Sequence, residues 1–287
     1  MRDLSNEQVV QVSKNGIDYL QFRVLLDLGV KHAYTLKCDN LLFKEPGFGK
    51  PMYLESYKKL CDCLELDSNG VVLPMQNHTD NVVSVYRNTL YSELKNVDGV
   101  LTNRQNLILS TTNADCILYL LYDPKKKVIG NIHSGWRGSY QRIIEKAIDK
   151  MVNDFGCETK DIIICICPSI RKCCFEVDED IRDMFYERFC FLDNINKFIL
   201  NGYKKGKYFI DTVGINNVLL GMNGIRNENI YDCRICSCCN SDLVHSYRVE
   251  GSSYKLATAV ISLWFWGEID GKKFWRIRRT NKGLQEM

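Results

Sequence analysis

The spacing of apolar and polar residues predicts short strands mixed with helices. Residues 81–87 (NVVSVYR) alternate apolar and polar side chains, as a half-buried strand does. After Pro51 the apolar residues instead recur three and four positions apart, which is the spacing of one helix face. That predicted face consists of Tyr57, Leu60, Cys61 and Leu64.

Three apolar runs follow one another in the middle of the chain, at 106–112, 116–123 and 127–133. The turn sequence DPKKK separates the last two runs, so they predict a β-hairpin. The same reasoning predicts further strands at 32–37, 70–75, 161–168 and 242–251. It predicts helices at 134–156, at 178–189 and after the strand that starts at 207, the last ending near Gly224.

The order of these elements determines the expected fold class. Hairpins and helices are interleaved, without the regular alternation of a doubly wound sheet, so the pattern predicts an α+β fold. No internal repeat and few prolines interrupt the 287 residues, a length that suits one large domain or two small ones.

Composition limits the kinds of partner and the cellular location that we expect. Hydrophobic residues make up 45%, charged residues 25%, and the net charge is +3, so neither nucleic acid nor a membrane is expected as a partner. The first residues are polar and no apolar run has the length of a membrane span, so we expect a cytoplasmic protein. We expect the basic segment at 271–282 to be a solvated tail, in preference to an RNA-binding element. The fourteen cysteines are then expected to be reduced.

Three residues with metal-binding side chains stand at the ends of predicted elements. Cys116 begins one hairpin strand and His133 ends the other, so the hairpin places them side by side. His78 lies in a loop between two strands and could complete the set. Two imidazoles and one thiolate suit zinc, with a fourth position left for water or substrate. Taken singly, each residue could equally be structural.

The four residues after Ser134 form a second candidate. Gly135 and Gly138 would let the backbone approach a ligand closely, and the following helix N-terminus would offer amide donors to an anion. Arg137 would add a cation suited to phosphate or carboxylate. The alternative is a helix-entry turn in which Trp136 anchors the core and Arg137 makes a surface pair.

An ordered set of motifs resembles the YfiH family, also called polyphenol oxidase or laccase-domain proteins. The motifs extend from Met75 to Arg248: MQNHTDNV, DGVLTN, NADCILYLLYD, IHSGWRGSYQRII, CPSIRKCCFEV and CSCCNSDLVHSYR. The resemblance implies one domain over residues 1–287, a layered α/β sandwich with mixed sheets. It also implies that His78, Cys116 and His133 are zinc ligands, in a site shared between the Gln76 loop and the turn at Gly135.

The resemblance also implies an activity. Family members carry out phosphorolysis of adenosine, inosine, guanosine and methylthioadenosine, with adenosine deamination alongside, so the partners would be a nucleoside and phosphate. The older laccase name implies copper, but one site of this kind lacks the several coppers that oxygen reduction needs. Alternatives are an amidase that edits cytoplasmic muropeptides, a copper-dependent polyphenol oxidase, and a metal-binding protein without turnover. The protein is expected to be a monomer or a homodimer.

Individual roles follow from the motifs. Arg137, Lys37 and Arg248 are candidates to hold the phosphate, with the amides of residues 135–138. Lys37 stands where the family usually has arginine. Asp115 is the carboxylate nearest to Cys116 in the sequence and is a candidate for proton transfer, although strand alternation would point it away from that thiol. Trp136 and Gln76 are expected to contact substrate.

A cysteine-rich segment, Cys233–Cys239, contains a Cys-x-x-Cys pattern. It could be a second zinc site or a redox pair, with His245 as the only nearby imidazole. Cys173 and Cys174 match a family pair and are expected to line the core near the site.

Overall fold

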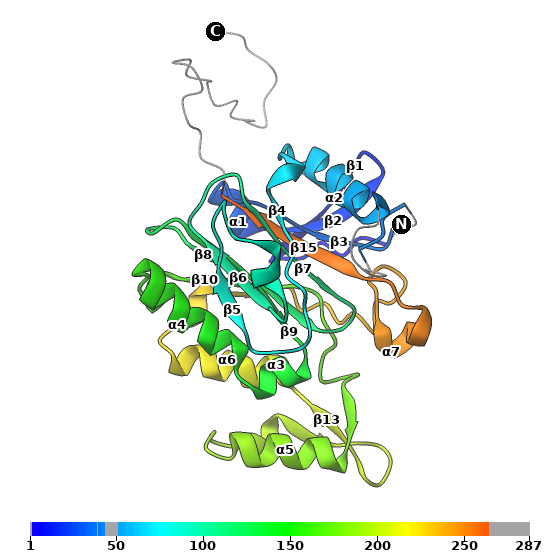
Figure 1. Cartoon of the computed structure of the whole chain (residues 1–287). Helices are drawn as coiled ribbons and strands as arrows, with labels where there is room; N and C mark the ends of the chain where they lie inside the picture. The colour runs from blue at the N-terminus through cyan, green and yellow to red at the C-terminus, as the bar shows by residue number, and fades with distance from the viewer. Residues whose placement is uncertain (1, 39, 44–50, 264–287) are drawn as a thin grey trace, which may run out of the picture.

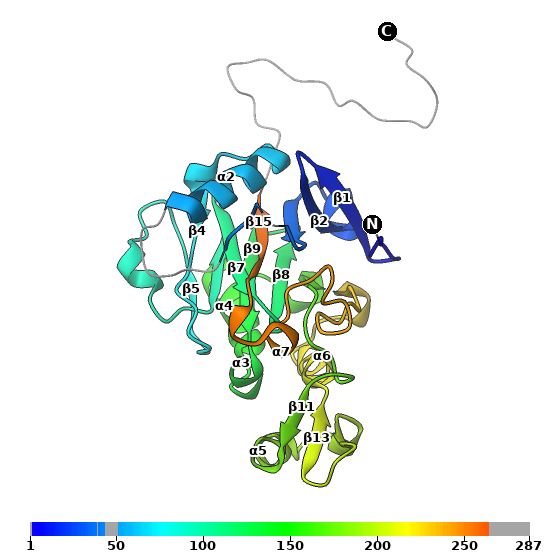
Figure 2. The ribbon, with the colours of Figure 1, turned by 90° about the vertical axis from the view of Figure 1, so that its right-hand side faces the viewer.

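Two six-stranded sheets stacked face to face form the body of the protein (Figure 1). The computed structural model describes residues 2–38, 40–43 and 51–263. Both large sheets contain parallel and antiparallel pairs, and helices cover their outer faces (Figure 2). The expected layered α/β fold with mixed sheets is therefore confirmed.

The first sheet combines both ends of the described chain. β15, the last strand, lies between β3 and β7 and pairs antiparallel with each. From edge to edge the order is β1 (Val9–Lys14), β2 (Ile17–Phe22), β3 (Lys31–Thr35), β15 (Ala257–Ser262), β7 (Ile108–Asn113) and β4 (Val71–Val72).

The second sheet contains the predicted hairpin and positions the candidate ligands. β8 and β9 pair antiparallel with Leu118 opposite His133 and Ile117 opposite Ser134, so Cys116 lies beside the end of β9. The order is β14 (Ile230–Asp232), β10 (Ile163–Ile166), β8 (Ile117–Asp123), β9 (Val128–Ser134), β6 (Gly99–Thr102) and β5 (Val82–Ser84).

Apolar side chains fill the space between the layers. The largest cluster lies between the two sheets and includes Leu109, Leu120 and Ile261. The buried Asn131 side chain joins the sheets there, because its amide donates to the carbonyls of Leu109 (3.0 Å) and Ala259 (2.8 Å). Because a buried amide needs hydrogen-bond partners, these two bonds favour one placement of the second sheet relative to the first.

Helices cover the outer faces of the two large sheets. α2 (Pro51–Leu64) packs on the first sheet through the predicted face, whose four residues are all buried. α4 (Ile143–Phe155) and α6 (Thr212–Met222) cover the second sheet. Gly156 ends α4 in the left-handed conformation, with φ of 67°, as a C-terminal glycine commonly does.

A smaller lobe extends from this body, at the bottom of Figure 1. Its sheet contains β11 (Glu176–Asp178), β13 (Lys207–Ile210) and β12 (Ile199–Asn201). α5 (Glu179–Phe189) packs on it through Phe185 and Phe189, which are fully buried. Both α5 and the strand–helix order after 207 agree with the sequence predictions.

Three predictions of secondary structure need correction. The helix expected at 134–156 is broken into α3 (Trp136–Tyr140) and α4, because Arg142 adopts a left-handed φ of 64°. Residues 242–251 form turns and the short helix α7 (Tyr247–Glu250), where a strand was expected. Only β4 remains of the strand expected at 70–75.

The sequence patterns missed the hairpin of β1 and β2 and the short helix α1 (Arg23–Asp27). Among the described residues, no helix is long and apolar enough to cross a membrane. The basic segment at 271–282 lies outside the described residues.

Candidate functional site

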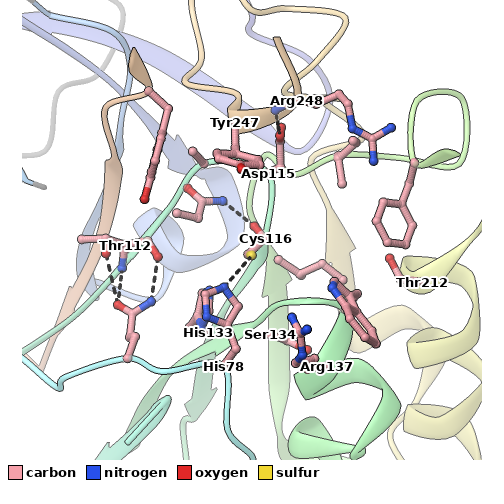
Figure 3. Close-up of a pocket in the computed structure, with 18 of the residues that line it drawn as sticks. His78, Thr112, Asp115, Cys116, His133, Ser134, Arg137, Thr212, Tyr247 and Arg248 are labelled. Atoms are coloured by element: carbon pink, nitrogen blue, oxygen red, sulfur yellow. Dashed lines mark hydrogen bonds between the residues drawn. The ribbon is translucent and has the colours of Figure 1, made fainter. Parts of the chain in front are cut away.

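His78, Cys116 and His133 meet at one end of the β8–β9 hairpin (Figure 3). Their candidate ligand atoms all lie within 4.8 Å of one another. The Sγ of Cys116 is 3.8 Å from Nε2 of His78, and the two imidazole rings are nearly perpendicular, with centroids 5.0 Å apart. The three residues that the sequence singled out as ligands therefore form one cluster.

Asp98, which the sequence analysis did not single out, orients both histidines. Its buried carboxylate accepts from Nδ1 of His133 at 2.8 Å and from the backbone N–H of His78 at 3.0 Å. It also accepts from the backbone N–H and the hydroxyl of Thr79. His78 has a left-handed φ of 56°, and these hydrogen bonds hold the loop in that conformation.

The Asp98 contact decides which nitrogen of His133 faces the cluster. A carboxylate on Nδ1 leaves Nε2 with its lone pair available to a metal, which is the usual arrangement around metal-bound histidines. Two signals in the sequence mark Asp98, its place at the start of the motif DGVLTN and directly before the buried strand β6, but neither assigned it a role. Its role depends on a contact made only in three dimensions.

Electrostatics inside the cluster favour a thiolate. Burial by itself would raise the pKa of the Cys116 thiol, but the charge of His133 and hydrogen bonds from both histidines outweigh burial and lower the pKa to about 6. Burial would lower the pKa of His133, yet Cys116 and Asp98 raise it to about 9. The thiol is therefore ready to act as an anionic ligand near neutral pH.

The donor set fits zinc in both chemistry and spacing. A sulfur and a nitrogen bound to one tetrahedral zinc lie about 3.6 Å apart, close to the separation of Cys116 and His78. Gly135 makes this approach possible, because a Cβ at that position would lie 2.7 Å from Cδ2 of His78 and 3.2 Å from Sγ of Cys116. His32 and His245, the other two histidines, bond to backbone groups and to Glu250 respectively.

A cleft of about 700 Å³ opens over the three ligands, a size suited to a small organic molecule. Polar groups from β7, the hairpin, α6 and α7 line it together with aromatic rings. The lining includes Thr112, Asp115, Trp136, Arg137, Phe175, Thr212, Tyr247, Arg248 and Tyr254.

Two arginines line the cleft, and they differ in the groups that they contact. Arg137 lies against the ring of Trp136, 4.2 Å from its centroid, and no carboxylate pairs with it among the described residues. Arg248 instead donates to the carbonyls of Cys174 (2.9 Å) and Glu176 (3.0 Å). Arg137 is therefore the cation that is better placed to meet an anionic ligand.

Asp115 and Gln76 line the cleft but are held by other groups. The Asp115 carboxylate accepts from the hydroxyl of Ser237 (2.6 Å) and the backbone N–H of Arg248 (2.7 Å). Asp115 lies in a bend with φ of 81°, outside the strand, so the expected strand alternation with Cys116 does not apply. Gln76 exchanges side-chain hydrogen bonds with Thr112 at the end of β7.

Lys37 is separate from the groups that line the cleft. Its ammonium pairs with Glu250 at 3.0 Å and donates to the carbonyl of Ser241. Glu250 also accepts from the backbone N–H of Ser246. The structure thus places Lys37 where it anchors the segment that carries Tyr247 and Arg248.

The turn after Ser134 differs from the expected helix N-terminus. α3 has only five residues, so it supplies little of the dipole expected from a long helix. Trp136 packs against the cluster around α5 while also lining the cleft. A Cβ on Gly138 would meet Ile143 at 3.3 Å and Ser134 at 3.4 Å, so the demand for glycine is weaker there than at Gly135.

The cysteine-rich segment forms a second cluster with unexpected partners. Cys236 and Cys239 meet Cys173 and Cys174, and no histidine joins them. Cys173 is exposed and Cys174 half-exposed, so the expectation that this pair lines the core is wrong. Cys233 is buried beside Arg171, outside the cluster.

Comparison with known proteins agrees with this architecture. Residues 53–263 match the family described as multi-copper polyphenol oxidoreductase laccase. A purine nucleoside phosphorylase of Borreliella burgdorferi is 32% identical over 243 residues, which are 83% of this chain and 95% of that protein. The human purine nucleoside phosphorylase LACC1 is 26% identical over 243 residues, 82% of this chain. The chain matches only 53% of the human protein and 39% of its mouse counterpart.

Solved structures show the same fold. The hypothetical protein YfiH of Bacillus licheniformis superposes with a TM-score of 0.76 at 27% identity, covering 88% of this chain and all of that one. YlmD from Geobacillus stearothermophilus has a TM-score of 0.75 at 21% identity, covering 91% and 99%.

Proposed function

The chain belongs to the multi-copper polyphenol oxidoreductase laccase family, and we propose that it is a zinc-dependent purine nucleoside phosphorylase. The observation that carries the proposal is the cleft itself, which combines three metal-ligand side chains with aromatic rings and with Arg137, an arginine that has no carboxylate partner among the described residues. Curated relatives named as purine nucleoside phosphorylases support the assignment. The proposed setting is the cytoplasm, which suits fourteen free cysteines.

Zinc is proposed over copper because of the ligand inventory. Oxygen reduction by several coppers needs several imidazole-containing sites, and the chain has only four histidines. Two of those, His32 and His245, are engaged elsewhere in the structure. When bound, zinc would supply Lewis acidity, which would also support adenosine deamination as a side activity.

The chain's own residues would position the two substrates. Phe175, Trp136 and Tyr247 offer apolar ring faces against which a purine can stack. During phosphorolysis the ribose carbon bonded to the base gains positive charge as the purine leaves, so phosphate must be held on the opposite face. Arg137 is assigned to that phosphate because it lines the cleft and no carboxylate within the described part of the chain pairs with its guanidinium.

Other residues would maintain the shape of this cleft. Asp115 is assigned to hold the backbone of Arg248, and Lys37 to anchor the same segment through Glu250. Gln76 would position Thr112 at the end of β7. Substrates of the proposed enzyme include adenosine, inosine, guanosine and methylthioadenosine.

The test measures metal and product in the same samples. The full chain, purified without added metal, is incubated with inosine or adenosine in the presence and absence of phosphate. Phosphate-dependent release of hypoxanthine or adenine, lost in Cys116→Ser together with one zinc ion per chain, would support the proposal. Bound copper together with oxygen consumption would contradict the proposal and indicate an oxidase. Zinc bound in the cleft without base release would also contradict it and leave an amidase or a protein without turnover as the remaining candidates.

A further inference from the structure

Four cysteines outside the cleft form a compact sulfur cluster. Cys173 and Cys174 lie in the turn after β10. Cys236 forms an isolated β-bridge with Ser169 after β14, and Cys239 lies in the turn that follows. Their four Sγ atoms all lie within 4.8 Å of one another. Cys239 is central, with its sulfur 3.7 Å from that of Cys173 and 3.4 Å from that of Cys174.

These separations match the edges of a tetrahedral thiolate site. Two sulfurs bound to one tetrahedral zinc lie about 3.8 Å apart, given zinc–sulfur bonds of about 2.3 Å. A disulfide would require about 2.0 Å between two of the sulfurs, and all fourteen cysteines are free. The pattern Cys236-x-x-Cys239 is also a common spacing for zinc ligands.

The backbone holds the two cysteine-bearing segments together without help from the sulfurs. Ser169 donates its N–H to the carbonyl of Ile235 at 3.3 Å, and Ser237 donates to the carbonyl of Ser169 at 3.0 Å. Within the first turn, Cys174 donates to the carbonyl of Arg171 at 2.8 Å. The four sulfurs therefore converge on a scaffold that is already formed.

Within the second turn, the side chain of Asn240 donates to the carbonyl of Cys236 at 2.7 Å, and its backbone N–H donates to the same carbonyl at 3.1 Å. The turn that separates Cys236 from Cys239 is thus held by hydrogen bonds of its own. Such preorganisation lowers the entropic cost of binding an ion.

We propose that Cys173, Cys174, Cys236 and Cys239 bind a second zinc ion as four thiolates, in a closed structural site. On binding, the four thiols release their protons to solvent and no electron is transferred. The site shares no ligand with the cleft, so it does not depend on the proposed enzymatic activity.

The position of the cluster gives this ion a structural role. Ser237, next to Cys236, hydrogen-bonds Asp115, and the carbonyl of Cys174 accepts from Arg248. Ile170 and Phe175, on either side of the first cysteine pair, line the cleft. An ion that joins the two segments would therefore brace one wall of the cleft, at the side where Asp115 and Arg248 lie in Figure 3.

The test counts zinc in the full chain purified under reducing conditions. The expected contents are two zinc ions per chain in the wild type, one in Cys173→Ser and one in Cys239→Ser. Both cysteines are exposed, so these replacements leave the apolar core intact. Cys190→Ser, which changes an exposed cysteine at the end of α5, is the matched control and should keep two ions.

A separate readout isolates the cluster from the cleft. The variant His133→Ala lacks a cleft ligand, so any metal it retains reports on the four cysteines. Loaded with Co²⁺, it should show the intense visible absorption and thiolate charge-transfer bands of tetrahedral sulfur coordination, and Cys239→Ser in that background should lose them. A metal-free His133→Ala variant, or a Cys174–Cys239 disulfide in the reduced preparation, would overturn the proposal.

Discussion

The cleft and the sulfur cluster are two groups of metal-ligand side chains with opposite designs. The cleft offers two imidazoles and one thiolate, next to an open volume of about 700 Å³. The sulfur cluster offers four thiols, and none of its four cysteines lines that cleft. Three protein ligands leave a position for a reacting molecule, whereas four complete a tetrahedron.

The two groups also differ in how the fold supports them. The cleft ligands come from the end of a hairpin and from a loop, and the buried Asp98 holds the imidazole of His133 and the backbone N–H of His78. The cysteines come from the segments after β10 and β14, which backbone hydrogen bonds hold together, and Cys236 is buried while Cys173 and Cys239 are exposed. A catalytic centre needs oriented ligands around an open position, whereas a structural site needs only that the fold bring its four ligands together.

The largest expected effect comes from removing a cleft ligand. His133→Ala should lower phosphorolysis by about 1000-fold, because a metal ion contributes several kcal/mol of transition-state stabilisation. The measurement is base release together with zinc content. Loss of activity should coincide with loss of one zinc ion and leave the ion of the sulfur cluster in place. Full activity in this variant would remove the cleft metal from the mechanism.

A smaller effect is expected at the residue that orients the ligands. Asp98→Asn should weaken zinc binding and activity by about 10- to 100-fold, because the amide no longer holds Nδ1 of His133 as a carboxylate does. Competition with a chromogenic chelator measures the affinity. Asp80→Asn is the control, because Asp80 lies in the loop that carries His78 and pairs instead with Lys146. Equal losses in both variants would contradict the orienting role.

The next effect concerns the space around the ligands. Gly135→Ala should reduce zinc affinity by about tenfold, since its Cβ would lie 2.7 Å from the ring of His78 and force the ligands apart. Gly138→Ala, whose Cβ would meet its nearest atom at 3.3 Å, should bind zinc nearly as the wild type does. If both variants bind zinc with equal affinity, the short distance between residue 135 and the ligands does not matter for metal binding.

The smallest expected effect is a difference in alkylation rate between the thiols of Cys116 and Cys173, in protein from which metal has been removed. With a pKa of about 6, Cys116 is already a thiolate above that pH, so its alkylation rate should rise through pH 6 and then level off. Burial and neighbouring thiols raise the pKa of Cys173 to about 12, so its rate should still be rising at pH 9. Mass-spectrometric mapping at pH 7 should find Cys116 modified several-fold faster, although Cys173 is the more exposed. The reverse order would contradict the electrostatic account.

Local patterns correctly predicted the helices and strands in which the spacing of apolar residues matches the buried face. The face of α2 and the pairing of β8 with β9 follow from spacing alone, and with the hairpin came the proximity of Cys116 and His133. The break at Arg142 was not visible, because an arginine gives no local signal for a left-handed φ of 64°. The segment 242–251 has a strand-like composition but forms turns and α7 in the structure.

The candidate site shows the same division between local and distant contacts. Asp98 and Asp115 are both acidic residues near the ends of strands, so the sequence could not tell that only Asp98 hydrogen-bonds the histidines. Lys37 was expected at the anion site but pairs with Glu250, more than two hundred residues away in the chain. Charge alone identifies candidates, and packing selects the partner.

The sequence by itself determined the types of ligand available and the hairpin that brings two of them together, because strand period and turn chemistry act over a few residues. Tertiary structure decided which groups complete each cluster. Asp98 reaches His133, and Cys173 reaches Cys239 across 66 residues, only after the sheets and loops have packed. Contacts between distant segments depend on how the whole core packs. No single stretch of sequence predicts that packing.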